Sequence, residues 1–151
     1  MRELVFALEF RGKARPVLGM EGAREARTTA SADGLITFAG GDWLRAHMKA
    51  AEPASAVLEA RVQRYADGTF VEEGTITYGT AGTLSFETVG RGWVEPSPVA
   101  GTMRGAVVWT IVGGTGALTG ATGLIASNFV ANADGDVVDN HVARLYVTAS
   151  S

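Results

Sequence analysis

The closest grouping of side chains that could do chemistry lies near the C-terminal end of the sequence. It contains six polar residues: Ser127, Asn128, Asp139, Asn140, His141 and Arg144. Asp139 and His141 are two positions apart, so on a β-strand their side chains would lie on the same face. A carboxylate beside an imidazole fixes the tautomer of the ring and prepares it to act as a general base. The alternative is a solvated strand face that carries cross-strand ion pairs.

A hairpin is expected to bring these residues together. Residues 133–135 read Ala-Asp-Gly, and Asp-Gly favours the tip of a tight turn between antiparallel strands. With the tip there, Asn128 would lie opposite Asp139 or Asn140, with an uncertainty of one residue in the register. We expect Asn128 and Asp139 to contact a substrate.

Glu9 and Arg11 form a second charged group, near the N-terminus. If the sheet closes on itself, the last strand pairs with the first, and this pair would come near His141 or Arg144. We then expect Glu9 to be the acid–base residue of an enclosed site. Arg11 and His141 would stabilise developing negative charge, and Asn128 would orient the substrate.

Several other side chains could line the same site. Trp109, Tyr78 and Phe129 are expected to form an apolar pocket, although packing in a core accounts for them equally well. Four glutamates lie in the middle of expected strands: Glu59, Glu72, Glu73 and Glu87. They could face a cavity, but a glutamate in a strand more often faces solvent.

The stretch GGTGALTGATG, residues 113–123, is rich in glycine and could be taken for a phosphate-binding loop. A dinucleotide fingerprint requires a third glycine where Thr119 stands, followed by a helix, whereas a strand pattern follows here. A Walker loop requires Lys and then Ser or Thr after its last glycine, and Leu124 follows Gly123. We therefore expect these glycines to form a tight turn between two strands.

The elements that must position these residues are short strands with alternating apolar and polar side chains. We expect strands at residues 3–11, 24–31, 35–39, 56–65, 70–78, 83–91, 104–112, 123–131 and 136–148. Ala-Asp-Gly recurs at 32–34, 66–68 and 133–135, and each copy is expected to be a hairpin tip. Residues 42–51 predict a short helix or lid. The sequence thus predicts one all-β domain over residues 1–151, a closed antiparallel β-barrel of about eight strands or a sandwich.

The composition limits the classes of function. The chain has 151 residues, a net charge of -3 and no cysteine, so it shows no basic surface for nucleic acid and no thiolate chemistry. Its two histidines are far apart in the sequence, so no metal is expected. No cofactor is expected either, because the nucleotide-binding motifs are absent. Without a signal-like or membrane-spanning apolar run, the protein is expected to be cytoplasmic and to have no membrane partner.

Residues 107–130, VVWTIVGGTGALTGATGLIASNFV, resemble the late strands and GGTG-type turn of the allene oxide cyclase and dirigent-protein barrels. The resemblance covers the last third of the chain most clearly and implies an eight-stranded antiparallel barrel. The first strand, followed by Pro16, resembles the strand of the cyclase that carries a cavity glutamate, which implies that role for Glu9. Arg11 stands where the cyclase has the asparagine that partners this glutamate.

Two functions follow as expectations. The first is a cofactor-free isomerase, cyclase or lyase that acts on a small hydrophobic substrate, such as an epoxide, a terpenoid or an aromatic intermediate. The second is a non-catalytic barrel that binds a small hydrophobic molecule, or that steers a reactive intermediate as dirigent proteins do. The resemblance also implies a homo-oligomer, a trimer or a dimer. If Glu9 and Arg11 face the cavity, the apolar row from Leu4 to Phe10 faces outward and needs a neighbouring subunit to cover it.

Overall fold

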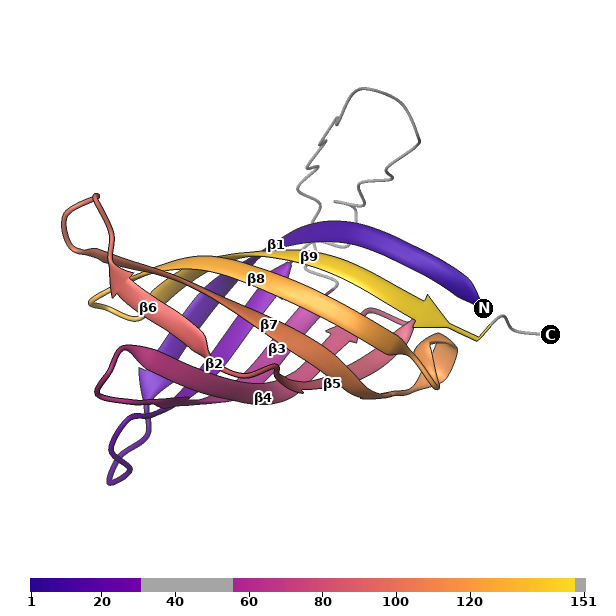
Figure 1. Ribbon diagram of the computed structural model, residues 1–151, viewed down its shortest axis with the longest axis horizontal. Helices are drawn as coiled ribbons and strands as arrows, with labels where there is room; N and C mark the ends of the chain where they lie inside the picture. Colours follow the sequence, from indigo (N-terminus) through magenta and orange to yellow (C-terminus); the bar gives the residue numbers. More distant parts are fainter. Residues whose placement is uncertain (31–55, 149–151) are drawn as a thin grey trace.

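A computed structural model describes residues 1–30 and 56–148 of the chain (Figure 1). These residues form nine β-strands and one 3-10 helix. The elements are β1 (Arg2–Pro16), β2 (Ala23–Ala30), β3 (Ala56–Arg64), β4 (Thr69–Tyr78), β5 (Gly82–Thr88), β6 (Gly92–Pro96), β7 (Thr102–Gly114), η1 (Gly116–Leu118), β8 (Thr122–Asn132) and β9 (Asp136–Val147). The strand expected at 35–39, the turn at 32–34 and the helix at 42–51 lie outside the described residues.

The strands close into a barrel in which every neighbouring pair is antiparallel. β1 pairs with β2 and also with β9, and the order continues through β8, β7, β5, β4 and β3 back to β2. β6 pairs with β4 and β7 and so occupies the same position in the barrel as β5, one after the other along it. The result is an eight-position closed antiparallel barrel, which confirms the predicted fold class.

The interior is filled by alternate residues of each strand, as the pleat of a β-strand requires. On β1 the side chains of Phe6, Leu8 and Phe10 are buried, so the apolar row faces inward. The expectation that Glu9 and Arg11 line the interior is therefore wrong. The physical reason is the burial energy of the large apolar side chains, about 1.5–3 kcal/mol each, against the cost of removing an ion pair from water.

Two of the expected Ala-Asp-Gly turns are present as predicted. Gly68 and Gly135 have φ angles of 84° and 83°, in the left-handed region that favours glycine, and they join β3 to β4 and β8 to β9. β6 was not predicted, because its segment carries Gly92 and Pro96 at its two ends and has no clear alternation.

The glycine-rich stretch is a turn between antiparallel strands, as predicted. β7 ends at Gly114 and β8 begins at Thr122, with η1 between them. Gly116 has a φ angle of 58°, and a Cβ at Gly114 would collide with the carbonyl oxygen of Leu118. Because Leu118 is itself buried, this turn packs into the end of the barrel that also carries the first and last strand ends (Figure 1).

Candidate functional site

A cavity of about 500 Å³ lies inside the barrel at the end opposite the glycine-rich turn. It is bordered there by the turns that join β1 to β2, β3 to β4, β6 to β7 and β8 to β9, the end on the left of Figure 1. Its apolar lining includes Leu58, Val62, Phe70, Val94, Met103, Phe129 and Val137. Four charged side chains line it as well: Arg24, Arg64, Glu72 and Asp139. A mostly apolar pocket with a few convergent polar groups is the usual form of a small-molecule site.

The backbone of Glu72 is held in place by the side chain of Thr88. The Thr88 hydroxyl accepts a hydrogen bond from the N–H of Glu72 at 2.7 Å and donates one to the carbonyl oxygen of Glu72 at 2.8 Å. Regular pairing of β4 with β5 ends at the neighbouring pair Glu73 and Glu87, so the threonine replaces the missing ladder bonds. This fixes the face of β4 from which the Glu72 side chain reaches the cavity.

The environment of Glu72 favours its neutral form. Burial, and then the nearby charge of Asp139, raise the pKa of the Glu72 carboxyl to about 8. The indole N–H of Trp109 favours the charged form of Glu72 and so opposes this shift. The opposition is weak, because this N–H forms no hydrogen bond with any acceptor in the described parts of the chain. At neutral pH the cavity therefore holds one protonated carboxyl group beside a second carboxyl group, Asp139.

Asp139 is oriented by two partners on separate oxygens. The Ser127 hydroxyl donates to Oδ1 at 2.7 Å, and Nε2 of His141 lies 2.9 Å from Oδ2. His141 is 1% exposed, and its ring is stacked on Phe10 with the centroids 4.2 Å apart. Because a carboxylate only accepts, Nε2 carries the hydrogen, and Nδ1 has no partner among the described residues.

The order of this network excludes one reaction type. In a serine hydrolase the histidine lies between the serine and the aspartate and removes the hydroxyl proton. Here Asp139 lies between Ser127 and His141. The hydroxyl is therefore not activated by the ring, and the group that the network positions is the carboxylate.

The structure separates the residues that the sequence singled out. Asp139 and His141 share the inner face of β9, as predicted. Asn128 lies opposite Asn140, one of the two expected registers, but its side chain is exposed on the outer face. Glu9 and Arg11 also lie outside, joined by an ion pair of 2.6 Å with the Arg11 side chain 68% exposed. These three residues do not reach the cavity, because each is out of phase with the inward row of its strand.

The predicted aromatic residues divide in a similar way. Phe129 lines the cavity. Trp109 is fully buried in the core against Phe86 and meets the His141 ring edge-on with the centroids 5.0 Å apart. Tyr78 packs against Phe6, and burial raises the pKa of its hydroxyl. Trp109 and Tyr78 therefore belong to the core around the site.

The sequence reasoning did not select Glu72, Arg24 or Arg64 for the site. A signal for Glu72 was present, because Phe70 and Ile76 lie two and four positions away and share its face of β4. The same phase places Glu73 outside. Arg24 and Arg64 occur at strand ends, where alternation is too short to fix the face.

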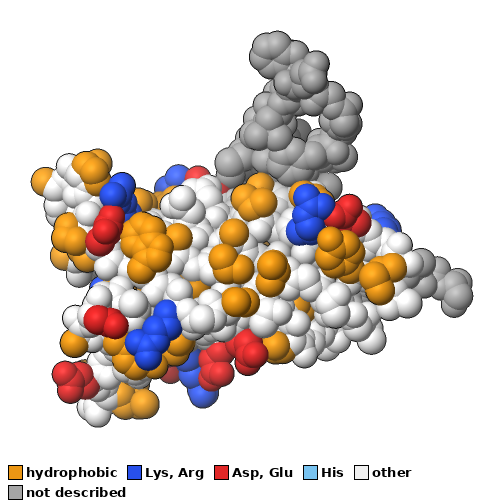
Figure 2. Space-filling model, in the orientation of Figure 1, with side chains coloured by type: hydrophobic (Ala, Val, Ile, Leu, Met, Phe, Trp, Pro, Cys, Tyr) orange, Lys and Arg blue, Asp and Glu red, His pale blue; other side chains and the backbone are white. Residues whose placement is uncertain are grey.

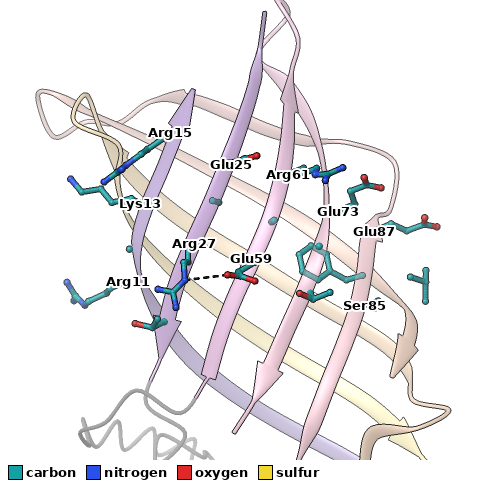
Figure 3. Close-up of a pocket in the computed structure, with 18 residues that line it drawn as sticks. Arg11, Lys13, Arg15, Glu25, Arg27, Glu59, Arg61, Glu73, Ser85 and Glu87 are labelled. Atoms are coloured by element: carbon teal, nitrogen blue, oxygen red, sulfur yellow. Dashed lines mark ion pairs between the residues drawn. The ribbon is translucent and has the colours of Figure 1, made fainter. Parts of the chain in front are cut away.

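A second hollow, of about 990 Å³, lies on the outer face of β1 to β5 (Figure 3). Basic side chains of β1 lie along one side of it and acidic side chains of β4 and β5 along the other, with the ion pair of Arg27 and Glu59 at 3.5 Å between them. The labelled groups are Arg11, Lys13, Arg15, Glu25, Arg27, Glu59, Arg61, Glu73, Ser85 and Glu87. Because these charges are open to water, their interactions are weak, and the inner cavity is the stronger candidate for chemistry.

Neither a family model nor a curated protein sequence matches this chain. In the part of the chain that the structure describes, no helix is long and apolar enough to cross a membrane. Within the same residues no three His, Asp or Glu side chains gather as metal ligands would. Fold and site define an antiparallel barrel with a carboxyl pair in an apolar cavity, and its function must be argued from that site.

Proposed function

We propose that the protein binds a small hydrophobic molecule in the barrel cavity and catalyses a cofactor-free acid–base reaction on it. The reaction classes that suit the site are isomerisation, cyclisation and elimination. The observation that carries the proposal is the pair of Glu72 and Asp139, two carboxyl groups in one apolar cavity with the pKa of Glu72 raised to about 8. Two such groups in unlike environments are the usual arrangement for an acid and a base in one site.

Each group has a distinct role in this proposal. Glu72 donates its proton to an oxygen of the substrate, for example an epoxide oxygen whose C–O bond breaks. Asp139, oriented by Ser127 and His141, accepts a proton from a neighbouring carbon. A proton that returns from Asp139 to Glu72 resets the site. The apolar walls hold the hydrocarbon and keep water away from the reacting atoms.

The alternative is a barrel that binds such a molecule without turning it over. The mostly apolar lining of the cavity favours it, and a Ser127–Asp139–His141 network can stabilise a core without catalysing a reaction. Substrate panels of epoxides, terpenoids and aromatic compounds, followed by mass spectrometry, separate the two functions. Binding without product for every compound supports the binder, and a product that disappears with Glu72→Gln but not with Glu73→Gln supports the enzyme.

We also propose a homo-oligomer, with its interface on a different face of the barrel from the apolar row of β1 that the sequence suggested. The apolar row of β1 is inside the barrel, so it needs no cover. Exposed apolar side chains instead occupy the outer face of β7, β8 and β9, and Figure 2 shows hydrophobic groups gathered there. They include Val108, Leu124, Val130, Val142 and Tyr146. A dimer or trimer through this face would remove them from water.

A further inference from the structure

Two arginines line the inner cavity close to the carboxyl pair. Arg24 lies at the start of β2 and Arg64 at the end of β3, and both are among the cavity residues. Arg24 is the ladder partner of Val62, and Arg64 is two positions further along the same face of β3. Both residues therefore lie on the inward rows of adjacent strands, at the end of the barrel where the hairpin turns lie.

In the described parts of the chain, these two cations have no carboxylate within ion-pair distance. Neither side chain forms an ion pair there, although the cavity contains two carboxyl groups. Burial, and then the charge of Arg24, lower the pKa of Arg64. Two like charges placed together in a partly dry pocket cost free energy that a bound anion would recover.

The chemistry of the pair defines what it can bind. Guanidinium groups present planar, forked donors that match the oxygens of a carboxylate, a sulfonate or a phosphate. Across the sheet, Arg24, Val62 and Glu72 are consecutive ladder partners on β2, β3 and β4. Arg24 is thus two strand spacings, about 10 Å, from Glu72. A molecule of ordinary metabolite size can contact both.

We propose that Arg24 and Arg64 bind an anionic group of the ligand while its apolar body occupies the cavity beside Glu72. The ligand is then an amphipathic anion rather than a neutral hydrocarbon. This inference rests on the proposed function in one respect: it takes the barrel cavity as the place where the ligand binds. It concerns recognition and holds whether or not the ligand is turned over.

The test uses two fluorescent probes that share one skeleton. Anilinonaphthalene sulfonate carries a negative charge, and N-phenyl-1-naphthylamine is its neutral counterpart. We expect the wild-type protein to bind the sulfonate about 10- to 100-fold more tightly than the neutral probe, as for a charge-assisted contact to a partly buried arginine. Raising the salt concentration should reduce that preference and leave the neutral probe unaffected.

Variants assign the preference to the two arginines. Arg64→Gln and Arg24→Gln should each lose most of the preference and retain the affinity for the neutral probe. Arg61→Gln is the matched control, because Arg61 is exposed on the outer face of the same strand. Competition by naphthoate, naphthyl phosphate and naphthol against the neutral probe then identifies the preferred anion on the wild-type protein alone.

The possible failures are distinguishable. Equal affinity of the wild-type protein for the two probes, or equal competition by naphthol and the anions, would overturn the anion site and leave the cavity as a ligand site. The same preference in Arg61→Gln, Arg64→Gln and Arg24→Gln would also overturn it. Absence of binding for both probes would contradict the proposed function itself.

Discussion

Glu72 and Asp139 line the same cavity, but their carboxyl groups have different surroundings. Asp139 accepts hydrogen bonds on both oxygens, from Ser127 and from His141. The backbone of Glu72 donates one hydrogen bond to the Thr88 hydroxyl and accepts one from it, and the Glu72 side chain lines an apolar cavity. Burial, and then the nearby charge of Asp139, disfavour the charged form of Glu72 and raise the pKa of its carboxyl group.

The proposed acid role predicts the kinetics of one substitution. Glu72→Gln keeps the size of the side chain and removes the ionisable proton. Once a substrate is found, kcat should fall by about 10²- to 10⁴-fold, as for the loss of a general acid. Glu73→Gln is the control, since that side chain is the next one along β4 and lies outside. Equal activity of the two variants would remove Glu72 from the mechanism.

The raised pKa of Glu72 also predicts how stability depends on pH. The carboxyl loses its proton near pH 4.5 in the unfolded chain and near pH 8 in the folded one. Between these values the folded state holds more protons, so its free energy of unfolding should decrease as pH rises and level off above about pH 8. Glu72→Gln should remove this decrease and be more stable than wild type at pH 8, by on the order of a few kcal/mol.

Urea titrations of both proteins at pH 5 and pH 8 measure this effect. Parallel pH dependence in wild type and Glu72→Gln would show that the carboxyl titrates normally in the fold. Glu73→Gln again serves as the control and should follow wild type at both pH values.

At the scale of the elements, alternation in the sequence was enough to predict most strands. Eight of the nine expected strands fall in the described residues and overlap observed ones, and the barrel follows from their antiparallel pairing. The face of β1 was harder to predict, because Val5 and Ala7 make its outer row nearly as apolar as its inner row. Only the pairing partners on β9 and the filled interior decide it.

The site was predictable from the sequence only where its residues lie on the same strand. Asp139 and His141 belong to one strand, so their spacing placed them on one face before any contact was known. Glu72 and Asp139 come from strands that are not adjacent in the barrel. Their proximity depends on the diameter of the closed barrel and on the side chains between them, which no short stretch of sequence contains.

The glycine-rich turn between β7 and β8 predicts how much two alanine substitutions destabilise the protein. Gly116→Ala introduces a Cβ only 2.7 Å from the carbonyl oxygen of Ala81 at a φ angle of 58°. Gly120→Ala faces a similar φ angle of 72°, but its Cβ would meet only Thr148 Oγ1 at 3.6 Å. Both should lose about 1 kcal/mol to backbone strain, and Gly116→Ala should lose about 1–3 kcal/mol more from the collision.

Thermal or urea unfolding of the two variants measures the difference. If Gly120→Ala were as destabilised as Gly116→Ala, the collision with Ala81 would contribute nothing to the loss of unfolding free energy. The glycine at 116 would then be explained by its φ angle alone.

At the scale of the whole molecule, the outer surface predicts self-association. Val142 lies in the middle of the exposed apolar face, with Ala126 and Ala7 as its ladder partners. Light scattering should give two or three times the chain mass of 15.7 kDa. Val142→Glu should reduce the mass to that of the monomer, because a charge buried in an interface without a partner is costly.

Val99→Glu is the control, since Val99 is exposed as well but lies in the turn between β6 and β7, away from this face. A monomeric wild-type protein at micromolar concentration would contradict the proposed oligomer. A Val142→Glu protein that keeps the wild-type mass would place the interface elsewhere.

The pairing of β1 with β9 has a consequence for how the protein folds. These strands come from opposite ends of the described chain, with Arg2 opposite Val147, so the barrel cannot close on the ribosome until its last strand has been synthesised. β9 also carries Asp139 and His141, so the final step of closure is the step that creates the carboxyl pair. Such long-range pairing makes folding slow, and the capacity to bind a ligand becomes a direct measure of the fraction of chains that have completed it.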